Sequence, residues 1–583
     1  MGDLQNTPIG PGNQPGKKKD MSMETRLLLA FLLMGLVLFL TPYIYKAPQP
    51  PPKPAKPVAT EQVPEKPAEP EKKPEEKKPA APTQPVPGQI QATSEQEFTV
   101  NTDIYRIRFS NRGAAVKSWV LKKYLDNAGK PQPLELVNPS ALAKVPPPFA
   151  LTVPKDDKID NILNYGLYVA KPAVDGMSIA YEFSDGKNYA KKSFEFTKSG
   201  FLAQVTTEVT QSGVPAEHLI EWRGGFGDAT VLNRLGEQHA AFYDLAQGSS
   251  GKLIKKDAKS VKDGPFSASG NYSFAGLDDR FFSFVFLPKD NTSTKVTVLK
   301  DEVPAAPNGK DELHVGVEVG GDSVNRMTVF VGPKDVDLLR KVDPKLQQLI
   351  DWGFFGVVAK PLFLALHWLN DNLVHNYGWS IVVITVIINV LLLPLRFSSM
   401  KSQKKMQALQ PQIAAINAKY KGLSMRDPKK AQQNQEVMEL YKKAGANPMG
   451  GCLPMVIQLP ILYAFYTVLN VTIELRGASW LWVGDLSQAE QLPIHILPIV
   501  MVITQFVMQK MTPNPSVDPA QAKMMQFMPL MFGFFFYSMS SGLVLYWLTG
   551  NLVGILQQYL INRTMPAPPP EAPKLAPKKK TKG

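Results

Sequence analysis

The sequence predicts a multi-domain protein, in which an α-helical membrane bundle of six spans is joined to a large extracytoplasmic antiparallel β-sandwich domain. Residues 98–343 carry apolar side chains at alternate positions between Gly, Asn, Asp and Pro turns, which is the pattern of short half-buried strands. Beyond residue 376, several apolar stretches approach the roughly 20 residues that a spanning helix needs. The formal net charge of +14 over 583 residues favours an anionic partner, either lipid headgroups or nucleic acid.

The N-terminal part is predicted to anchor the chain and to space it from the membrane. Residues 1–26 form a cytoplasmic segment, and the apolar run at 27–45 follows a cluster of Lys and Arg, as in an export signal. No small-x-small cleavage site follows the run, so we predict an uncleaved anchor; a cleaved signal peptide is the alternative. Residues 46–95 alternate Pro, Lys, Glu and Ala, a composition that favours an extended linker.

The β-domain is predicted over residues 96–343. Its alternation is clear at Tyr105, Ile107 and Phe109, and the stretch SDGKN at 184–188 is a typical turn. With the anchor oriented N-terminus inside, this domain lies on the outer side of the membrane. We expect its aromatic residues to form the core.

Residues 344–373 are apolar and aromatic but are interrupted by charged residues, glycines and a proline. We predict an amphipathic helix lying in the outer membrane interface, held by Trp352 and Trp368. A seventh span is the alternative.

The segment 374–561 is predicted to hold five spans, at 377–396 and at about 449–472, 493–511, 524–539 and 542–561. A helical hairpin at 397–447 carries ten basic and three acidic residues, which places it in the cytoplasm. The loop 473–492 is acidic and is predicted on the outer side, whereas the basic tail 562–583 returns to the cytoplasm.

Polar residues within the apolar spans indicate a functional interior. Thr385, Asn389 and Arg396 recur at spacings of four and seven, and so share one helical face. A polar group facing hydrocarbon is costly, so this face is expected to line a bundle interior or a water-filled cavity. In the last span, Trp547 and Asn551 share a face with Gln558, for which ordinary helix packing is the favoured interpretation.

The sequence gives no support for an enzyme, a metal site or a cofactor. Cys452 is the only cysteine, and the six histidines show no metal-ligand spacing. Neither a phosphate-binding glycine-rich loop nor a nucleophile elbow is present.

Several stretches resemble the YidC family of membrane-protein insertases, of the Gram-negative type: FSNRGAAVKSW at 109–119, AKPLF at 359–363, NPMGGCLPMVIQLPI at 447–461 and SGLVLYWLTGNLVGILQQ at 541–558. The resemblance implies a five-helix insertase core enclosing a hydrophilic groove that is open to the cytoplasm and the lipid. It also implies the insertion and folding of proteins in the bacterial inner membrane without nucleotide hydrolysis, with the β-domain in the periplasm and both termini in the cytoplasm.

The resemblance also implies groove residues, where the positions match. Thr385 and Gln458 match, and Trp547 falls where the family has a substrate-contacting aromatic residue. The family usually has an arginine five residues before a Pro-Leu pair, where this chain has Asn389. Arg396 lies seven residues later, about 10 Å further along the helix, and is a candidate replacement. The alternative is that Arg396 extends to the lipid headgroups. The predicted substrate groove is Thr385, Asn389, Arg396, Gln458, Trp547 and Asn551.

The expected partners are nascent membrane proteins, the ribosome and anionic phospholipids, but not DNA, and the resemblance adds the Sec translocon. Ribosomal RNA and lipid headgroups would select the same basic residues. The candidates are Lys401, Lys404, Lys405, Lys429, Lys430, Lys578, Lys579 and Lys580.

A transporter that uses the polar groove as a solute path is the alternative function. The sequence lacks inverted repeats and an acidic residue within a span for ion coupling, and both absences argue against it. An outer-face binding protein with a simple anchor would leave the polar helix face unexplained.

Overall fold

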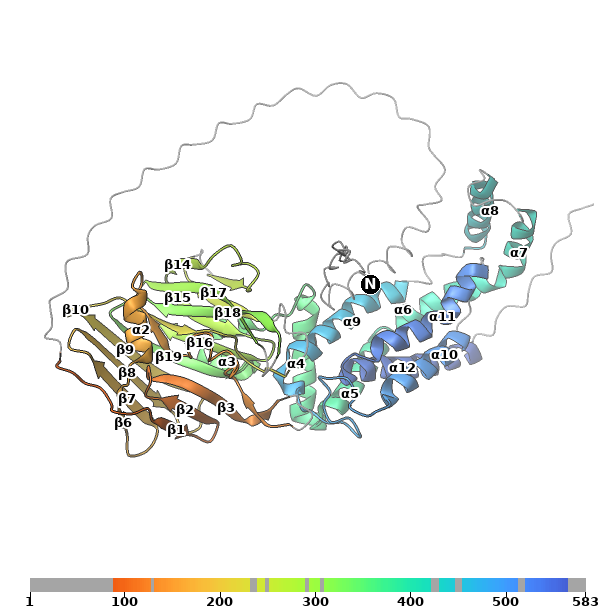
Figure 1. The fold of residues 1–583 in the computed structure, drawn as a ribbon. Coiled ribbons are helices and arrows are strands. Elements are labelled where there is room, and N and C mark those ends of the chain that lie inside the picture. The colour runs from red at the N-terminus through yellow and green to blue at the C-terminus, as the bar shows by residue number, and fades with distance from the viewer. Residues whose placement is uncertain are drawn as a thin grey trace, which may run out of the picture.

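The computed structural model describes residues 87–126, 131–230, 238–246, 251–288, 293–304, 309–420, 429–445, 453–511 and 519–564. These residues form a β-rich domain with a helical region beside it (Figure 1). The predicted anchor at 27–45, most of the linker and the tail beyond residue 564 lie outside the described residues.

The β-domain contains three antiparallel sheets, which confirms the predicted antiparallel β class. The four-stranded sheet has the order β1 (Glu97–Asn101), β2 (Tyr105–Ser110), β3 (Ala115–Leu125), β4 (Pro133–Glu135). The five-stranded sheet has the order β14 (Phe266–Gly270), β17 (Thr294–Pro304), β18 (Asp311–Gly320), β11 (Leu219–Trp222), β5 (Ala150–Thr152). The ten-stranded sheet runs β13 (Lys252–Lys256), β12 (His239–Asp244), β15 (Tyr272–Asp278), β16 (Phe282–Pro288), β19 (Val324–Pro333), β9 (Leu202–Gln211), β8 (Asn188–Phe196), β7 (Ser178–Ser184), β6 (Val169–Pro172), with β10 (Val214–Pro215) beside β9. A helix, α2 (Asp157–Tyr165), follows β5.

The turn between β7 and β8 shows how local chemistry sets strand register. The Asp185 carboxylate accepts hydrogen bonds from the backbone N–H groups of Lys187 and Asn188, at 2.8 and 2.6 Å. Gly186 has a φ of +86°, which costs a glycine little. This turn pairs Ser184 with Tyr189, so alternate side chains of both strands point into the same core.

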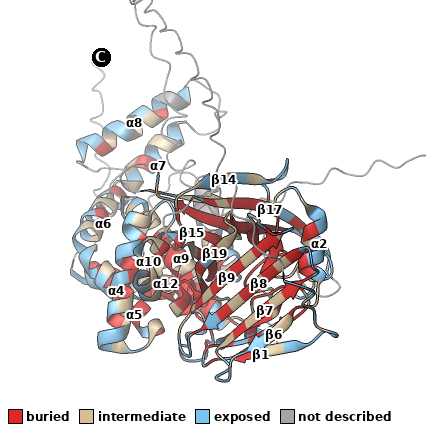
Figure 2. Cartoon of the chain, turned by 90° about the vertical axis from the view of Figure 1, so that its left-hand side faces the viewer, coloured by how far each residue is buried: buried red, intermediate tan, exposed pale blue. Residues whose placement is uncertain are grey.

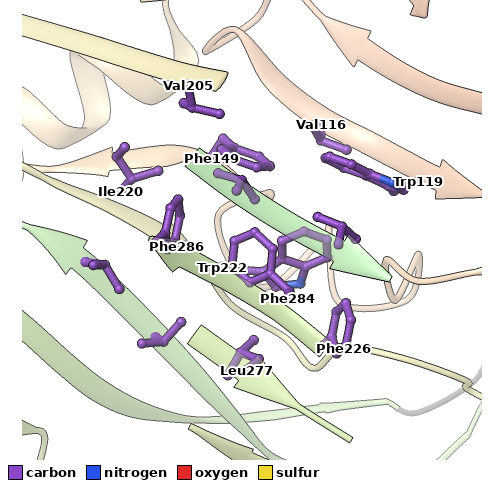
Figure 3. Packing of buried hydrophobic residues seen from close by; sticks show 14 of the residues in the cluster. Val116, Trp119, Phe149, Val205, Ile220, Trp222, Phe226, Leu277, Phe284 and Phe286 are labelled. Atoms are coloured by element: carbon purple, nitrogen blue, oxygen red, sulfur yellow. The ribbon is translucent and has the colours of Figure 1, made fainter. Parts of the chain in front are cut away.

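Aromatic side chains fill that core, as the sequence led us to expect (Figure 3). Trp119, Phe149 and Trp222 are fully buried, and the rings of Trp222 and Phe284 lie 4.3 Å apart between centroids. Figure 2 shows buried residues concentrated in the strands, whereas α2 and much of α8 face outward.

The helical region begins with α3 (Val336–Val342), a 3-10 turn (Pro344–Leu349) and α4 (Gly356–Leu369), which continues into a π-helical turn (Asn370–Val374). Then follow α5 (Tyr377–Leu391), α6 (Leu393–Ala408), α7 (Gln410–Lys419), α8 (Lys429–Lys443), α9 (Leu453–Val471), a 3-10 turn (Ile473–Leu475), α10 (Ile496–Met511), α11 (Pro519–Phe536) and α12 (Ser541–Thr564).

Two predicted helices are interrupted. The expected first core span, 377–396, is split between α5 and α6 at Leu392, because Pro394 has no N–H to continue the hydrogen-bond ladder. The first hairpin helix is likewise divided at Leu409, ahead of Pro411.

By length and apolar composition, no single helix among the described residues qualifies as a membrane span. The segments Gly356–Val374 and Tyr377–Leu391 qualify only as a pair, and they are bent by 115° relative to each other. Shorter apolar helices occur at Val456–Val471, Ile496–Met511 and Phe527–Phe536. The count of six spans therefore stays a prediction.

The β-domain is fastened to the helical region near the C-terminal end of α9. Arg280 donates a hydrogen bond of 2.7 Å from Nε to the carbonyl oxygen of Asn470. Arg476, in the loop after α9, forms an ion pair with Asp228 and lies over the rings of Phe281 and Phe282. The predicted outer loop thus contacts the β-domain directly.

Glu474 lies in the same junction, and its burial predicts that the stability of the folded chain depends on pH. Burial, helped by the negative charges of Asp335 and Asp337, raises the pKa of its carboxyl group from 4.5 to about 8. The folded state therefore holds this proton more tightly than the unfolded state, so stability is complete below pH 4.5 and falls as the pH rises toward 8. Glu474→Gln keeps a neutral side chain at every pH, and should raise the melting temperature of the full chain in detergent at pH 8 by about 5 °C or more. At pH 4.5 the two proteins should melt together; an equal difference at both pH values would contradict this assignment.

Candidate functional site

Helix α12 is the element around which the predicted polar residues gather. Tyr546 and Gln557 are eleven residues apart, about three helical turns, and therefore share one face. Trp547 and Asn551 lie on the neighbouring face. One face of α12 contacts α5, α6 and α9, and the next contacts α10 and α11.

On α5, the two predicted polar residues are buried and bonded within their own helix. The Thr385 hydroxyl donates to the carbonyl oxygen of Ile381 at 2.6 Å, and Asn389 Nδ2 donates to the carbonyl oxygen of Thr385 at 2.7 Å. Asn389 is only 3% exposed, and its Oδ1 has no hydrogen-bond partner among the described residues. Asn389 therefore keeps an unused acceptor inside the bundle.

Arg396 points toward α12. Its Nη1 donates a 3.1 Å hydrogen bond to Oε1 of Gln557. A Cβ atom at Gly554 would lie 3.5 Å from the same nitrogen, an ordinary van der Waals distance, so the guanidinium lies close beside α12 at this residue. Within the described ranges, no carboxylate lies within ion-pair distance of Arg396. The side chain is half-buried and packed on α12.

Gln458 connects α9 to α12. Its Nε2 donates a hydrogen bond to the hydroxyl oxygen of Tyr546, whose ring stacks on Phe465 with centroids 4.0 Å apart. Gln458 is half-buried, so it lies at the edge of the packed interior.

Trp547 and Asn551 face the other side. Trp547 Nε1 donates to Oε1 of Gln505 at 3.3 Å, and its ring contacts Phe532 and Phe536 of α11. Asn551 Nδ2 donates to the hydroxyl of Thr504 at 3.2 Å and lies 3.3 Å from the carbonyl oxygen of Met501. These two residues bind α10 and α11 to α12.

The six predicted groove residues therefore fall into three groups in the helices around and including α12. Thr385, Asn389 and Arg396 lie on the α5 and α6 side, Gln458 on the α9 side, and the remaining two on the α10 side. Gln557 and Tyr546, which join the first two groups to α12, were missed by the sequence analysis. Their spacing of eleven residues in an apolar span was the available signal.

The basic candidates differ in exposure. Lys401, Lys405 and Lys429 are exposed. Lys404 is instead buried within the chain: it is 8% exposed, and its Nζ donates to the carbonyl oxygen of Ile561 at 3.2 Å. This carbonyl lies in the last turn of α12, where backbone oxygens lack donors within the helix, so the ammonium group fits there. The side chain of Lys430 and residues 578–580 lie outside the described part of the chain.

The hairpin carrying these lysines has a small core of its own. Met406, Ile413 and Tyr441 are buried together, and Lys419 forms a 3.2 Å ion pair with Glu436 across α7 and α8. Across the described residues, no three His, Cys, Asp or Glu side chains are arranged to hold a metal ion.

The chain is thus a two-part protein, in which a large antiparallel β-domain is fastened to a bundle of apolar helices with polar contacts between them. Two family models match the chain: "YidC periplasmic domain" over residues 97–365 and "60Kd inner membrane protein" over residues 368–568. Proteins named "Membrane protein insertase YidC" are similar to it. The one from Geobacter sp. (strain M21) is 33% identical over 81% of this chain and 86% of its own length, and the one from Geotalea uraniireducens (strain Rf4) is 32% identical over 94% and 100%. The chain belongs to the YidC family of membrane protein insertases, as its sequence motifs predicted.

Two solved structures are more distantly similar. One, described as an active YidC insertase with the first transmembrane domain resolved, is 20% identical with a TM-score of 0.35, over 81% of this chain and 95% of that one. The other, a galactose mutarotase related enzyme from Lactobacillus acidophilus, is 10% identical with a TM-score of 0.29, over 40% of this chain and 97% of that one. Both TM-scores are too low to establish a common fold.

Proposed function

We propose that this chain inserts nascent membrane proteins into the bacterial inner membrane, and assists their folding, through a hydrophilic groove enclosed by five spans: α5 with α6, α9, α10, α11 and α12. The groove opens to the cytoplasm and to the lipid. The observation that carries the proposal is the set of buried and half-buried polar side chains joined to α12 within otherwise apolar helices. Polar residues are costly in a membrane, so their presence there usually indicates a function.

The physical problem of insertion is the transfer of a polar segment across hydrocarbon. Each unsatisfied polar group costs several kcal/mol in that medium. Amide and hydroxyl groups such as those of Gln458, Asn389 and Thr385, together with water, would satisfy the segment for part of the way. The apolar part of the substrate would then leave sideways into the lipid, where its burial supplies the driving force. This sequence of events needs no nucleotide.

The decisive experiment is insertion of a short single-span substrate into liposomes that contain only this purified chain, scored by protease protection of the translocated tail. Wild type should protect the tail without nucleotide, and Asn389→Leu should reduce protection. Asn372→Leu is the matched control, because Asn372 is exposed and lies in the turn before α5. If wild type gave no more protection than empty liposomes, with a substrate that inserts in native membranes, an accessory chaperone or a transporter would be favoured.

We further propose that the ribosome and anionic phospholipids bind the basic residues of the hairpin and of the tail, and that the Sec translocon is a second partner. Removing residues 566–583 should weaken co-sedimentation with ribosomes, most strongly at low salt, because cation-phosphate contacts release counterions. A truncated chain that co-sediments as well as wild type would leave anionic lipids as the partner of the tail. The exposed Lys401 and Lys405 would then be the next residues to test.

A further inference from the structure

The side chain of Gln557 lies between Asn389, which occupies the position of the family arginine, and Arg396, its candidate replacement. Its Oε1 accepts a hydrogen bond from Arg396 Nη1 at 3.1 Å, and its Nε2 donates to the backbone carbonyl oxygen of Asn389 at 3.3 Å. It is 7% exposed, so both bonds are largely buried. The amide of Gln557, on α12, therefore bonds to both α6 and α5.

The chain break at Leu392 explains why Asn389 offers a free carbonyl. Helix α5 ends at Leu391, and the last carbonyl groups of a helix lack donors within it. Pro394, just after the break, lacks the N–H that the Val390 carbonyl would meet in a continuous helix, and so helps to end α5 here. A side-chain amide from α12 fills this need at Asn389.

The same two bonds leave Gln557 only one orientation. A carbonyl oxygen only accepts hydrogen bonds, and a guanidinium group only donates them. The amide nitrogen must therefore face Asn389 and the amide oxygen must face Arg396. Rotating the amide by half a turn would place donor against donor and acceptor against acceptor.

The guanidinium of Arg396 also lies close to the backbone of α12 at Gly554. Gly554 lies one turn before Gln557 on α12, and a Cβ there would come within 3.5 Å of Arg396 Nη1 and 3.1 Å of Met508 Sδ. The first distance is an ordinary van der Waals contact, so the guanidinium lies close against α12 at Gly554.

We propose that Gln557 is a positioning residue, which holds the guanidinium of Arg396 against α12 and beside Asn389, at the place where the groove needs a cation. The proposal rests on the proposed groove function. It assigns Gln557 no contact with substrate, because both polar ends of its amide are occupied by Arg396 and Asn389. The break at Leu392 makes this arrangement possible. In an unbroken helix, the Asn389 carbonyl would accept a hydrogen bond from within the helix.

Gln557→Leu removes both hydrogen bonds at similar side-chain volume. We expect the rate of insertion into liposomes to fall about tenfold, the size expected for losing a hydrogen bond to a charged group. Gln558→Leu is the matched control: Gln558 is the adjacent residue, is also buried, and donates to Asn562 instead of contacting Arg396. It should insert substrate at close to the wild-type rate.

A double-mutant cycle separates positioning from a general loss of stability. In a chain that already carries Arg396→Ala, Gln557→Leu should cause less than a twofold further loss, because the group to be positioned is gone. A full tenfold further loss, or a melting temperature lowered in step with the rate in Gln557→Leu alone, would overturn the proposal. Rescue gives a second readout: Gln557→Glu keeps an acceptor for Arg396 and should insert faster than Gln557→Leu.

The proposal and the groove function fail differently. If wild type does not insert substrate, the groove function fails. If wild type inserts substrate, Arg396→Ala is impaired and Gln557→Leu matches wild type, only the role of Gln557 is wrong.

Discussion

Arg396→Ala should lower the rate of insertion into liposomes by about 100-fold. Arg396 packs against α12, where its guanidinium donates to Gln557, whose amide also bonds to the Asn389 carbonyl. Charge-assisted hydrogen bonds are roughly twice as strong as neutral ones, and partial burial increases their value. A substrate tail with carbonyl or carboxylate groups would lose this interaction on its way across.

The control is Arg563→Ala. Arg563 is exposed in the last turn of the same helix, so its loss removes an equal charge without changing the interior. Arg396→Lys should give an intermediate rate, because it keeps the charge but not the planar fork of donors. If Arg396→Ala inserted substrate normally while Asn389→Leu did not, the replacement of the family arginine by Arg396 would be wrong.

Arg476→Leu should destabilise the attachment of the β-domain by about 3–5 kcal/mol, the usual cost of breaking one partner of a buried ion pair. The side chains of Arg476 and Asp228 are 5% and 2% exposed, so the variant would leave an isolated carboxylate in the interior. Arg476 also donates to the carbonyl oxygen of Leu125 at 2.7 Å, and that bond would be lost as well. Thermal unfolding of the full chain in detergent, followed together with limited proteolysis at the junction, measures the change.

Two further variants test this reason. Arg106→Leu, an exposed arginine on β2, should leave both measurements unchanged. Adding Asp228→Asn to Arg476→Leu removes the unpaired charge and should recover part of the loss. A double variant as unstable as Arg476→Leu alone would show that the ion pair is not the source of the effect.

The β-domain was largely predictable because its signals are local. Alternation at Tyr105, Ile107 and Phe109 specifies which face is buried, and the SDGKN sequence specifies a turn whose hydrogen bonds the structure shows at Asp185. Apolar run length likewise located α9, α10 and α12.

The contacts between distant segments were not predictable in the same way. Arg476 and Asp228 are 248 residues apart, and nothing local to either residue indicates the other. Lys404 was read as a surface cation because its neighbours are basic, yet it meets the end of α12. Gln557 was overlooked because it lies within the apolar sequence of α12 and nothing local distinguishes it. Only the position of α5 shows that its amide bonds to the Asn389 carbonyl.

The central claim is that the polar segment of a substrate passes along the polar interior beside α12. Photo-crosslinking of a stalled nascent chain tests it most directly, with the photoreactive residue placed at Gln458 or, as a control, at Leu556, which is exposed on the outside of the same helix bundle. We predict that the polar tail of the substrate crosslinks to position 458 and not to position 556. Equal crosslinking at both positions, or crosslinking at 556 alone, would contradict a groove route.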